Sequence, residues 1–453
     1  MTGLLTWWVV LAALAVWLAS RRGAESPLML TYFFALSMIH VGGAINYLGG
    51  SVMLYHERET YEGFRLTLIG LSAMLVVVFL LRVLKLVESS KVVDAPMMPM
   101  RTVYRVIGLG ALTYFVMNPL SWILPSGTVI SATLAGLLPL GFWFWVHNAA
   151  RSDAPWQQLP RIAAVAVLLP VATLLGSGFL GFGVSLALTI AVMVLVVWPQ
   201  KSPFVLAMPL IGYLGLSLGA SYMIHRNDIR DAVWGGEDLR TRIQATTQIF
   251  TDFRFYDVND PETVAAVESR FNQNVLVGLG LQSHASGFAQ LQYGATVPLW
   301  SLIPRVLWPD KPDIGGGRTV VSDFTGIYFT DGTSVGAGNP LEFYINFGWA
   351  GVIGGFALLG GLLGWHDRNL VDGLRANDLR KVVLYGLPGL TLINPGGNLL
   401  EVFIAFIAAQ FVARAFVVVL GSAFVARLLG FEAAVATSKR PAAGRLRPSR
   451  QER

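Results

Sequence analysis

Eleven apolar runs, each close to the length of a membrane-spanning helix, set the limits on how this chain can fold. They lie at about 4–19, 28–49, 64–84, 103–123, 128–147, 161–180, 182–198, 203–224, 341–365, 382–397 and 399–420. A bilayer core about 30 Å thick needs roughly 20 apolar residues per helix. Charged residues make up only 13% of the 453, which excludes an ordinary soluble domain. The sequence therefore predicts an all-α polytopic membrane protein with about 11 transmembrane helices.

The basic residues predict an orientation for these helices. Arg21 and Arg22 follow the first apolar run, whereas a cleavable signal peptide would carry its positive charges before the run. We therefore expect a retained first helix with both arginines in the cytoplasm. Alternation then places the basic loops around 82–91 and 366–381 on the same side. The Pro-rich, basic tail at 421–453 is predicted to be disordered and cytoplasmic, either touching anionic lipid or having no role.

One long polar segment, residues 225–340, interrupts the series of short loops. It carries nine Arg and Lys against thirteen Asp and Glu, a net charge of −4. We expect a large extracytoplasmic, partly helical loop domain, with the functional site in it. The predicted organisation is an N-terminal bundle of about eight spans at 1–224, this loop domain at 225–340, about three spans at 341–420, and the tail at 421–453.

Two helices are predicted in the first half of the loop domain. Leu239, Ile243 and Phe250 have near-helical spacing, which is typical of an amphipathic helix lying on the membrane surface. Further along, Asp260 and Pro261 have the residue types of an N-cap and a first helical position. The apolar stripe of this second helix is predicted to comprise Val264, Val267, Phe271 and Val275.

Arg270 lies beside that stripe rather than in it, so it is either a solvated helix charge or a ligand-binding group.

A Pro-rich strap occupies residues 301–318, with the sequence SLIPRVLWPDKPDIGGGR. Its prolines restrict their own backbone angles and those of the preceding residues, so we expect a stiff, non-helical segment. Trp308 is predicted to anchor the strap at the level of the lipid headgroups. The prolines concerned are Pro304, Pro309 and Pro312.

The strap holds cations that have two possible roles. Arg305 and Lys311 would be fixed in place, as is needed to bind phosphate oxygens without reorganisation. The glycines before Arg318 could add backbone N–H groups beside a further guanidinium. Alternatively, these cations pair with the nearby carboxylates of Asp310, Asp313 and Asp323.

Three titratable residues are candidates for acid–base chemistry, each with a structural alternative. Glu342 stands three residues after Asn339, either as a carboxylate at a helix N-terminus or as a general base. His284 is either a general base or a structural histidine. Glu401 enters an apolar helix, where an ionisable residue is a functional candidate unless it reaches water.

No cofactor or metal is expected. The chain has no cysteine, which excludes thiolate sites. Asp310 and Asp313 flank Lys311, whose charge would oppose a bound cation.

The strap and the segment NPLEFYINFGWAGVIGG resemble the Wzy-type polymerases of oligosaccharide repeat units. The first signature, Pro-Arg-aromatic-Pro-x-Lys-Pro, and the second, Glu-aromatic-x-Asn-Phe-Gly, cover the last third of the loop domain and the start of the ninth span. An upstream SRFNQ, which contains Arg270, resembles the arginine-bearing outer helix of that family. The matching positions are Pro304, Arg305, Trp308, Pro309, Lys311, Pro312, Glu342, Tyr344, Asn346, Phe347 and Gly348.

The resemblance implies a glycosyltransferase at the periplasmic face of the bacterial inner membrane, similar to the metal-independent C-type membrane glycosyltransferases. Such an enzyme transfers the growing glycan from undecaprenyl diphosphate to the non-reducing end of an incoming lipid-linked repeat unit. Implied partners are undecaprenyl-diphosphate-linked oligosaccharides, membrane lipids and a polysaccharide chain-length regulator, and no nucleic acid is expected. The implied diphosphate ligands are Arg270, Arg305, Lys311 and Arg318, and the implied catalytic candidates are Glu342 and His284.

Two other functions remain open from the sequence. An O-antigen ligase of the same superfamily would use similar cations, although the strap favours the polymerase. A flippase or transporter of lipid-linked oligosaccharides would need charges along the spans and two alternating halves, whereas the charge here lies mostly outside the spans.

Overall fold

The computed structural model describes residues 1–21, 23–49, 56–86, 95–121, 127–285, 302–303, 307–308, 310–311, 317–329 and 335–421. These ranges form helices joined by turns and contain no strand, so the all-α prediction is confirmed for them. Residues 422–453, nearly all of the predicted tail, lie outside the described residues. The helices are α1 (Thr2–Ala19), α2 (Pro27–Leu48), α3 (Glu57–Val83), α4 (Met100–Leu112), η2 (Thr113–Met117), α5 (Asn118–Leu120), α6 (Gly127–Ala135), α7 (Leu137–Ala150), α8 (Pro155–Ser177), α9 (Gly181–Val197), α10 (Ser202–Trp234), α11 (Leu239–Thr251), α12 (Pro261–Phe271), α13 (Asn274–Ala285), α15 (Gly317–Thr325), α16 (Asn339–Arg375), α17 (Leu379–Thr391) and α18 (Leu399–Gly421).

The helix lengths are those of a polytopic membrane protein. Within the described ranges, eight helical segments are long and apolar enough to cross a bilayer. The other three predicted spans correspond to the 17-residue α9, the 13-residue α17, and α4, which continues through the π-helical turn η2 into α5. Large apolar side chains such as Leu206 and Phe411 are mostly exposed, as lipid contact requires. The count of eleven spans remains a prediction.

Helix α3 packs on α16 along one side and on α13 along another. Glycines bring these backbones close together. A Cβ atom on Gly63 would lie 2.0 Å from the carbonyl oxygen of Asn274, and one on Gly360 would lie 2.7 Å from that of Met74. Such contacts fix α13 and α16 on α3 more closely than larger side chains would allow.

Buried charges fasten the end of the bundle at which α2 begins. Asp367 of α16 is fully buried, and it accepts hydrogen bonds from the backbone N–H groups of Leu28 at 2.7 Å and Met29 at 3.1 Å. These are among the first N–H groups of α2, which have no partner within their own helix. Arg82 of α3 donates to the Ser26 hydroxyl at 2.7 Å and to the Leu18 carbonyl. Together these contacts tie α1, α2, α3 and α16.

Replacement of Asp367 by alanine is expected to lower the free energy of unfolding by about 3 kcal/mol, because it leaves two buried N–H groups unsatisfied. Thermal unfolding of the purified variant in detergent measures the loss. The matched control is Glu62→Ala, which removes an exposed ion pair with Arg65 and should change stability by no more than about 0.5 kcal/mol. Equal stability of the two variants would contradict this assignment.

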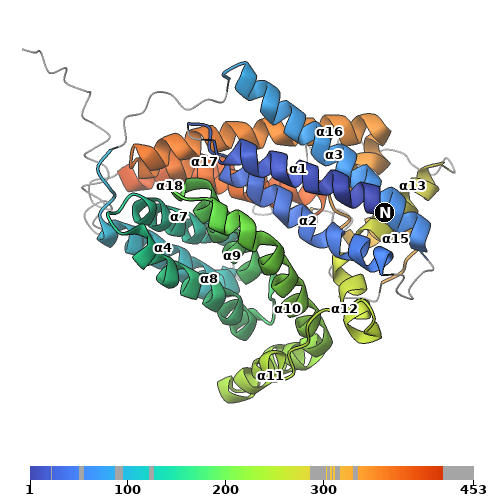
Figure 1. The fold of residues 1–453 in the computed structure, drawn as a ribbon. Helices are drawn as coiled ribbons and strands as arrows, with labels where there is room; N and C mark the ends of the chain where they lie inside the picture. The colour runs from blue at the N-terminus through green and yellow to red at the C-terminus, as the bar shows by residue number, and fades with distance from the viewer. Residues whose placement is uncertain are drawn as a thin grey trace, which may run out of the picture.

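Figure 1 shows α12, α13 and α15 gathered at the end of the bundle where the N-terminus lies, which we call the site end. Helix α10 reaches this end and continues without a break to Trp234, so the domain boundary predicted at residue 225 falls inside a helix. The predicted amphipathic helix at 239–250 is observed as α11, and α12 starts at Asp260 and Pro261 as predicted. The predicted stripe is interrupted, because α12 ends at Phe271 and a new helix begins at Asn274.

Candidate anion-binding site

Three arginines from two helices come together at the site end. Arg226 and Arg230 are one turn apart on α10 and therefore share a face. Arg270, in the last turn of α12, lies close enough to both for their charges to interact. The pKa of Arg270 is below its ordinary value, first because of partial burial among its neighbours and second because Arg230 is nearby. By its accessible surface Arg270 is exposed, so an anion can reach it.

The positive charge of this arginine cluster is not neutralised by neighbouring carboxylates. Within the described ranges, no carboxylate forms an ion pair with any of the three guanidinium groups. Asp228 and Asp231 are on the same helix, but they point about 200° and 140° away from Arg226 around the helix axis. Because arginine stays charged, the arrangement costs repulsion that a bound anion would relieve.

Arg230 is held by aromatic rings. Its guanidinium carbon is 5.0 Å from the ring centroids of both Phe179 and Trp234, within the range of a cation–π interaction. Its Nε atom is buried and has no hydrogen-bond acceptor. The indole of Trp234 donates to the Ser177 carbonyl at 3.1 Å, and Tyr222 donates to the Gly178 carbonyl at 3.2 Å. The end of α8 thus fixes both Arg230 and the part of α10 that carries it.

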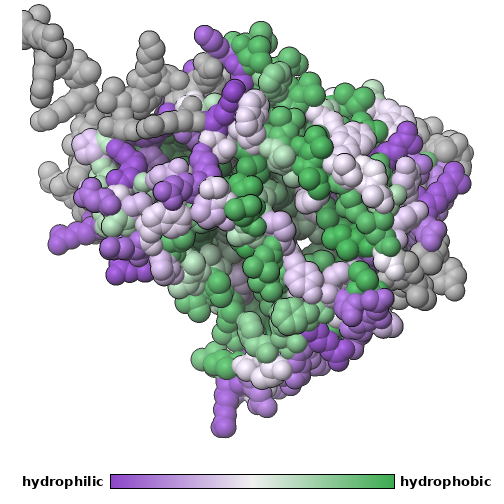
Figure 2. All heavy atoms as spheres, in the orientation of Figure 1, coloured by the Kyte–Doolittle hydropathy of each residue, from purple (hydrophilic) through white to green (hydrophobic). Residues whose placement is uncertain are grey.

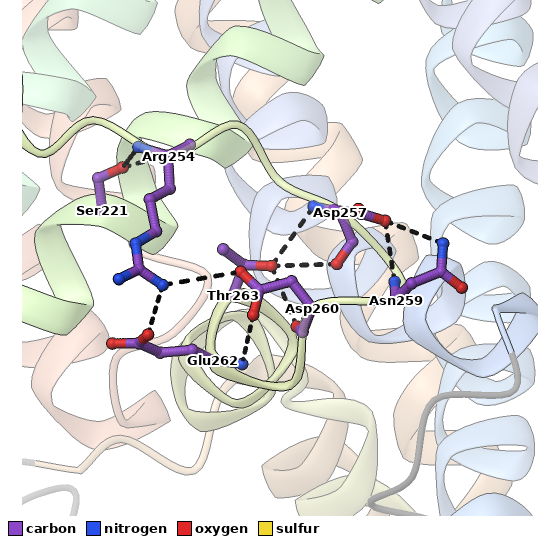
Figure 3. Close-up of polar contacts among 7 residues, drawn as sticks. All are labelled: Ser221, Arg254, Asp257, Asn259, Asp260, Glu262 and Thr263. Atoms are coloured by element: carbon purple, nitrogen blue, oxygen red, sulfur yellow. Dashed lines mark hydrogen bonds and ion pairs between the residues drawn. The ribbon is translucent and has the colours of Figure 1, made fainter.

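A polar cluster positions the start of α12 against α10. The residues in Figure 3 are Ser221, Arg254, Asp257, Asn259, Asp260, Glu262 and Thr263. The backbone N–H of Arg254 donates to the Ser221 hydroxyl at 3.0 Å, and its guanidinium pairs with Glu262. Asp260 caps α12 by accepting from the N–H of Glu262 at 3.1 Å. Arg254 is therefore neutralised, in contrast to the three arginines of the cluster.

The other end of α12 is wedged between two membrane helices. The Cβ atom of Phe271 is 2.9 Å from the place where a Cβ would stand on Gly42 of α2. The tip of its ring is 2.7 Å from the corresponding place on Gly219 of α10. Only glycine at both positions admits this aromatic side chain. Since Arg270 is the preceding residue, the fit of Phe271 also fixes the backbone that carries Arg270.

Hydrogen bonds hold α12 on α2. Asn46 of α2 donates to the Glu268 carboxylate at 2.8 Å and accepts from the Tyr256 hydroxyl. Asn272 donates to the same carboxylate. The pKa of Tyr256 is raised to about 12, mainly by burial and further by the charge of Glu268, so the phenol stays protonated as a donor.

The same contact continues at the start of α13, where the Asn274 side-chain oxygen accepts from Nδ1–H of the His40 ring at 2.7 Å and its amide nitrogen donates to the His40 carbonyl at 2.7 Å.

Arg270 lies near Arg226 and Arg230, which were not among the strap cations expected to bind the diphosphate beside it. Arg305 lies outside the described residues, as do all three strap prolines. Lys311 donates from its ammonium group to the Ile303 carbonyl at 3.0 Å. Arg318 is half-buried in the first turn of α15, a helix that packs on α13 rather than on α12.

The proposed acid–base residues lie elsewhere at the site end. Glu342 is fully buried in the first turn of α16, which confirms its predicted place at a helix N-terminus. Its helix begins beside the α12–α13 junction, because Gln273 lies against Gly338, 3.1 Å from where a Cβ would stand. His284 is in the last turn of α13, and its side chain lies outside the described residues. Glu401 is exposed in the first turn of α18.

Within the same ranges, no group of three or more His, Asp and Glu side chains is arranged to hold a metal ion.

The sequence prediction assigned no role to Arg226 and Arg230, because it ended the eighth span at residue 224. A usable signal was present. Two arginines four residues apart follow the apolar run, and no proline or glycine stands between them and Trp234 to end the helix. Comparison with known proteins adds no relative, since no family model, curated protein or solved structure matches this chain.

Proposed function

We propose that this protein is a membrane glycosyltransferase that polymerises lipid-linked oligosaccharide repeat units at the periplasmic face of the bacterial inner membrane. The observation that carries the proposal is the cluster of Arg226, Arg230 and Arg270, unneutralised within the described ranges, at the end of an apolar helix. Its charge and guanidinium geometry suit a diphosphate that leaves from a lipid carrier.

In the proposed reaction, a hydroxyl at the non-reducing end of the incoming repeat unit attacks the anomeric carbon of the growing glycan. The bond from that carbon to the diphosphate oxygen breaks, and the hydroxyl proton passes to a base. The products are the lengthened lipid-linked glycan and undecaprenyl diphosphate. The arginine cluster would stabilise the charge that develops on the leaving diphosphate, and Arg305, Lys311 and Arg318 are proposed as further ligands. Glu342 and His284 are the candidate bases.

An apolar route to the cluster supports the same proposal. Leu206 is 80% exposed, Leu210 60% and Ile211 59%, and a Cβ on Gly212 or Gly215 would meet no atom within 4 Å. Together, these five positions cover about 240° of the circumference of α10. Most of the surface of α10 between residues 206 and 215 therefore has no protein neighbour. Figure 2 shows a hollow beside α10 on the side of α2. A polyprenyl chain lying there would place its diphosphate near the arginines.

The test is deletion of the gene followed by gel analysis of surface glycan. Loss of long chains with retention of a single capped repeat unit is the expected result, and the wild-type gene should restore the long chains. Loss of every glycan, including the single repeat, would instead indicate the ligase or flippase alternative.

A further inference from the structure

The chain after α10 doubles back along that helix. It turns at Gly235 and Gly236, and Ile249 of α11 then packs with Tyr222, Ile229 and Val233 of α10. Beyond α11, the backbone N–H of Arg254 donates to Ser221, that of Tyr256 donates to Ser217, and the Tyr213 hydroxyl donates to the Tyr256 carbonyl at 3.1 Å. Each contact lies nearer the start of α10 than the one before. We call α11 together with residues 252–256 the return segment.

The end of the return segment packs on the apolar part of α10. The rings of Phe255 and Tyr213 are stacked, with centroids 6.3 Å apart and planes 7° apart. Tyr213 is eleven residues after Ser202, or about 16 Å along a helix that rises about 1.5 Å per residue. The hydrocarbon core is about 30 Å thick. Tyr213 therefore belongs to the stretch of α10 that is long and apolar enough to cross a bilayer, and the Phe255 ring is stacked on that stretch.

The return segment exposes apolar side chains, and also the charged side chains of Asp252 and Arg254. Phe255 is 59% exposed, Phe250 53% and Ile243 46%. On α11, Leu239, Ile243 and Phe250 fall within about 40° of one another around the axis, next to the face that packs on α10. Gln244 is exposed on the polar side, about 100° from Ile243. The exposed stripe is thus separate from both the packed face and the polar face.

We propose that the return segment is seated in the bilayer leaflet at the site end, with Phe255, Phe250 and Ile243 against phospholipid acyl chains. Acyl chains are the expected contact because this exposed surface adjoins that of α10. Phe255 stacks on Tyr213, which is itself 42% exposed on the apolar part of a candidate span. The sequence predicted α11 on the membrane surface, and we place its carboxyl end and residues 252–256 deeper in that leaflet. The seating fixes the depth of α10 and α12, and it does not depend on any transferase activity.

Site-directed spin labelling of the full chain tests the proposal. Because the chain has no cysteine, Phe255→Cys, Phe250→Cys, Ile243→Cys and the control Gln244→Cys each give one labelling site. The labelled proteins are reconstituted in phosphatidylethanolamine–phosphatidylglycerol liposomes, and collisions of the nitroxide are measured with oxygen, which concentrates among acyl chains, and with a water-soluble nickel chelate. The label should favour oxygen at 255, 250 and 243, most strongly at 255, and the nickel chelate at 244.

Two results would overturn the proposal. Preference for nickel at 255 and 250 would place the surface in water, and exclusion of both reagents would mean that a second copy or another protein covers it. All four positions are at the surface of the described structure, so substitution removes little packing; if one variant fails to fold, the remaining apolar positions decide the test.

Discussion

The Arg270→Ala variant is expected to lose glycan chain extension while its thermal stability stays the same or rises slightly. Loss of one donor to a developing anionic charge lowers a transfer rate by about 100-fold. Stability should not fall, because Arg270 has no ion pair within the described residues and its removal relieves repulsion from Arg230. Chain length on gels and thermal unfolding of the purified protein give the two measurements.

Two further variants sharpen this result. Arg240→Ala removes an exposed arginine on the polar side of α11 and should leave chain length unchanged. Arg270→Lys keeps the charge but loses the planar fork that binds two phosphate oxygens, so chain extension should be intermediate. Glycan chains of normal length in the Arg270→Ala variant would contradict the proposal that Arg270 binds the diphosphate. A loss of stability large enough to explain the defect would contradict it as well.

Replacement of Gly63 by alanine is expected to damage both stability and function. The new methyl group would lie 2.0 Å from the carbonyl oxygen of Asn274, and a backbone atom cannot rotate away. Helices α3 and α13 would have to separate, at a cost of about 3 kcal/mol or more. The shift would also move the junction at 272–274, which holds Arg270 in place. Thermal unfolding in detergent and chain length on gels should both show the loss.

The matched control is Gly212→Ala, which makes the same substitution in another apolar helix. No atom lies within 4 Å of the new methyl group, so stability should stay the same or rise by up to about 1 kcal/mol. Equal unfolding temperatures for the Gly63→Ala and Gly212→Ala variants would show that α3 and α13 do not approach each other as closely as described.

The candidate site was only partly predictable. Arg270 was singled out because it lies beside an apolar stripe and within SRFNQ, which resembles a motif of a known family, but its expected partners Lys311 and Arg318 lie on other elements. Arg226 and Arg230 were missed because the prediction ended a helix where its apolar run ends. Helix α10 instead continues for a further ten residues, held by contacts of Tyr222 and Trp234 with the end of α8.

The sequence by itself determined the features that depend on neighbouring residues. Apolar length predicts helices that can span a bilayer, Asp260 and Pro261 start α12, and Asn339 starts α16 with Glu342 in its first turn. Only the tertiary structure decided which arginines meet. Arg230 and Arg270 are forty residues apart, and what joins them is the fit of Phe271 between Gly42 and Gly219. That fit depends on backbone approach between distant helices, which no local pattern encodes.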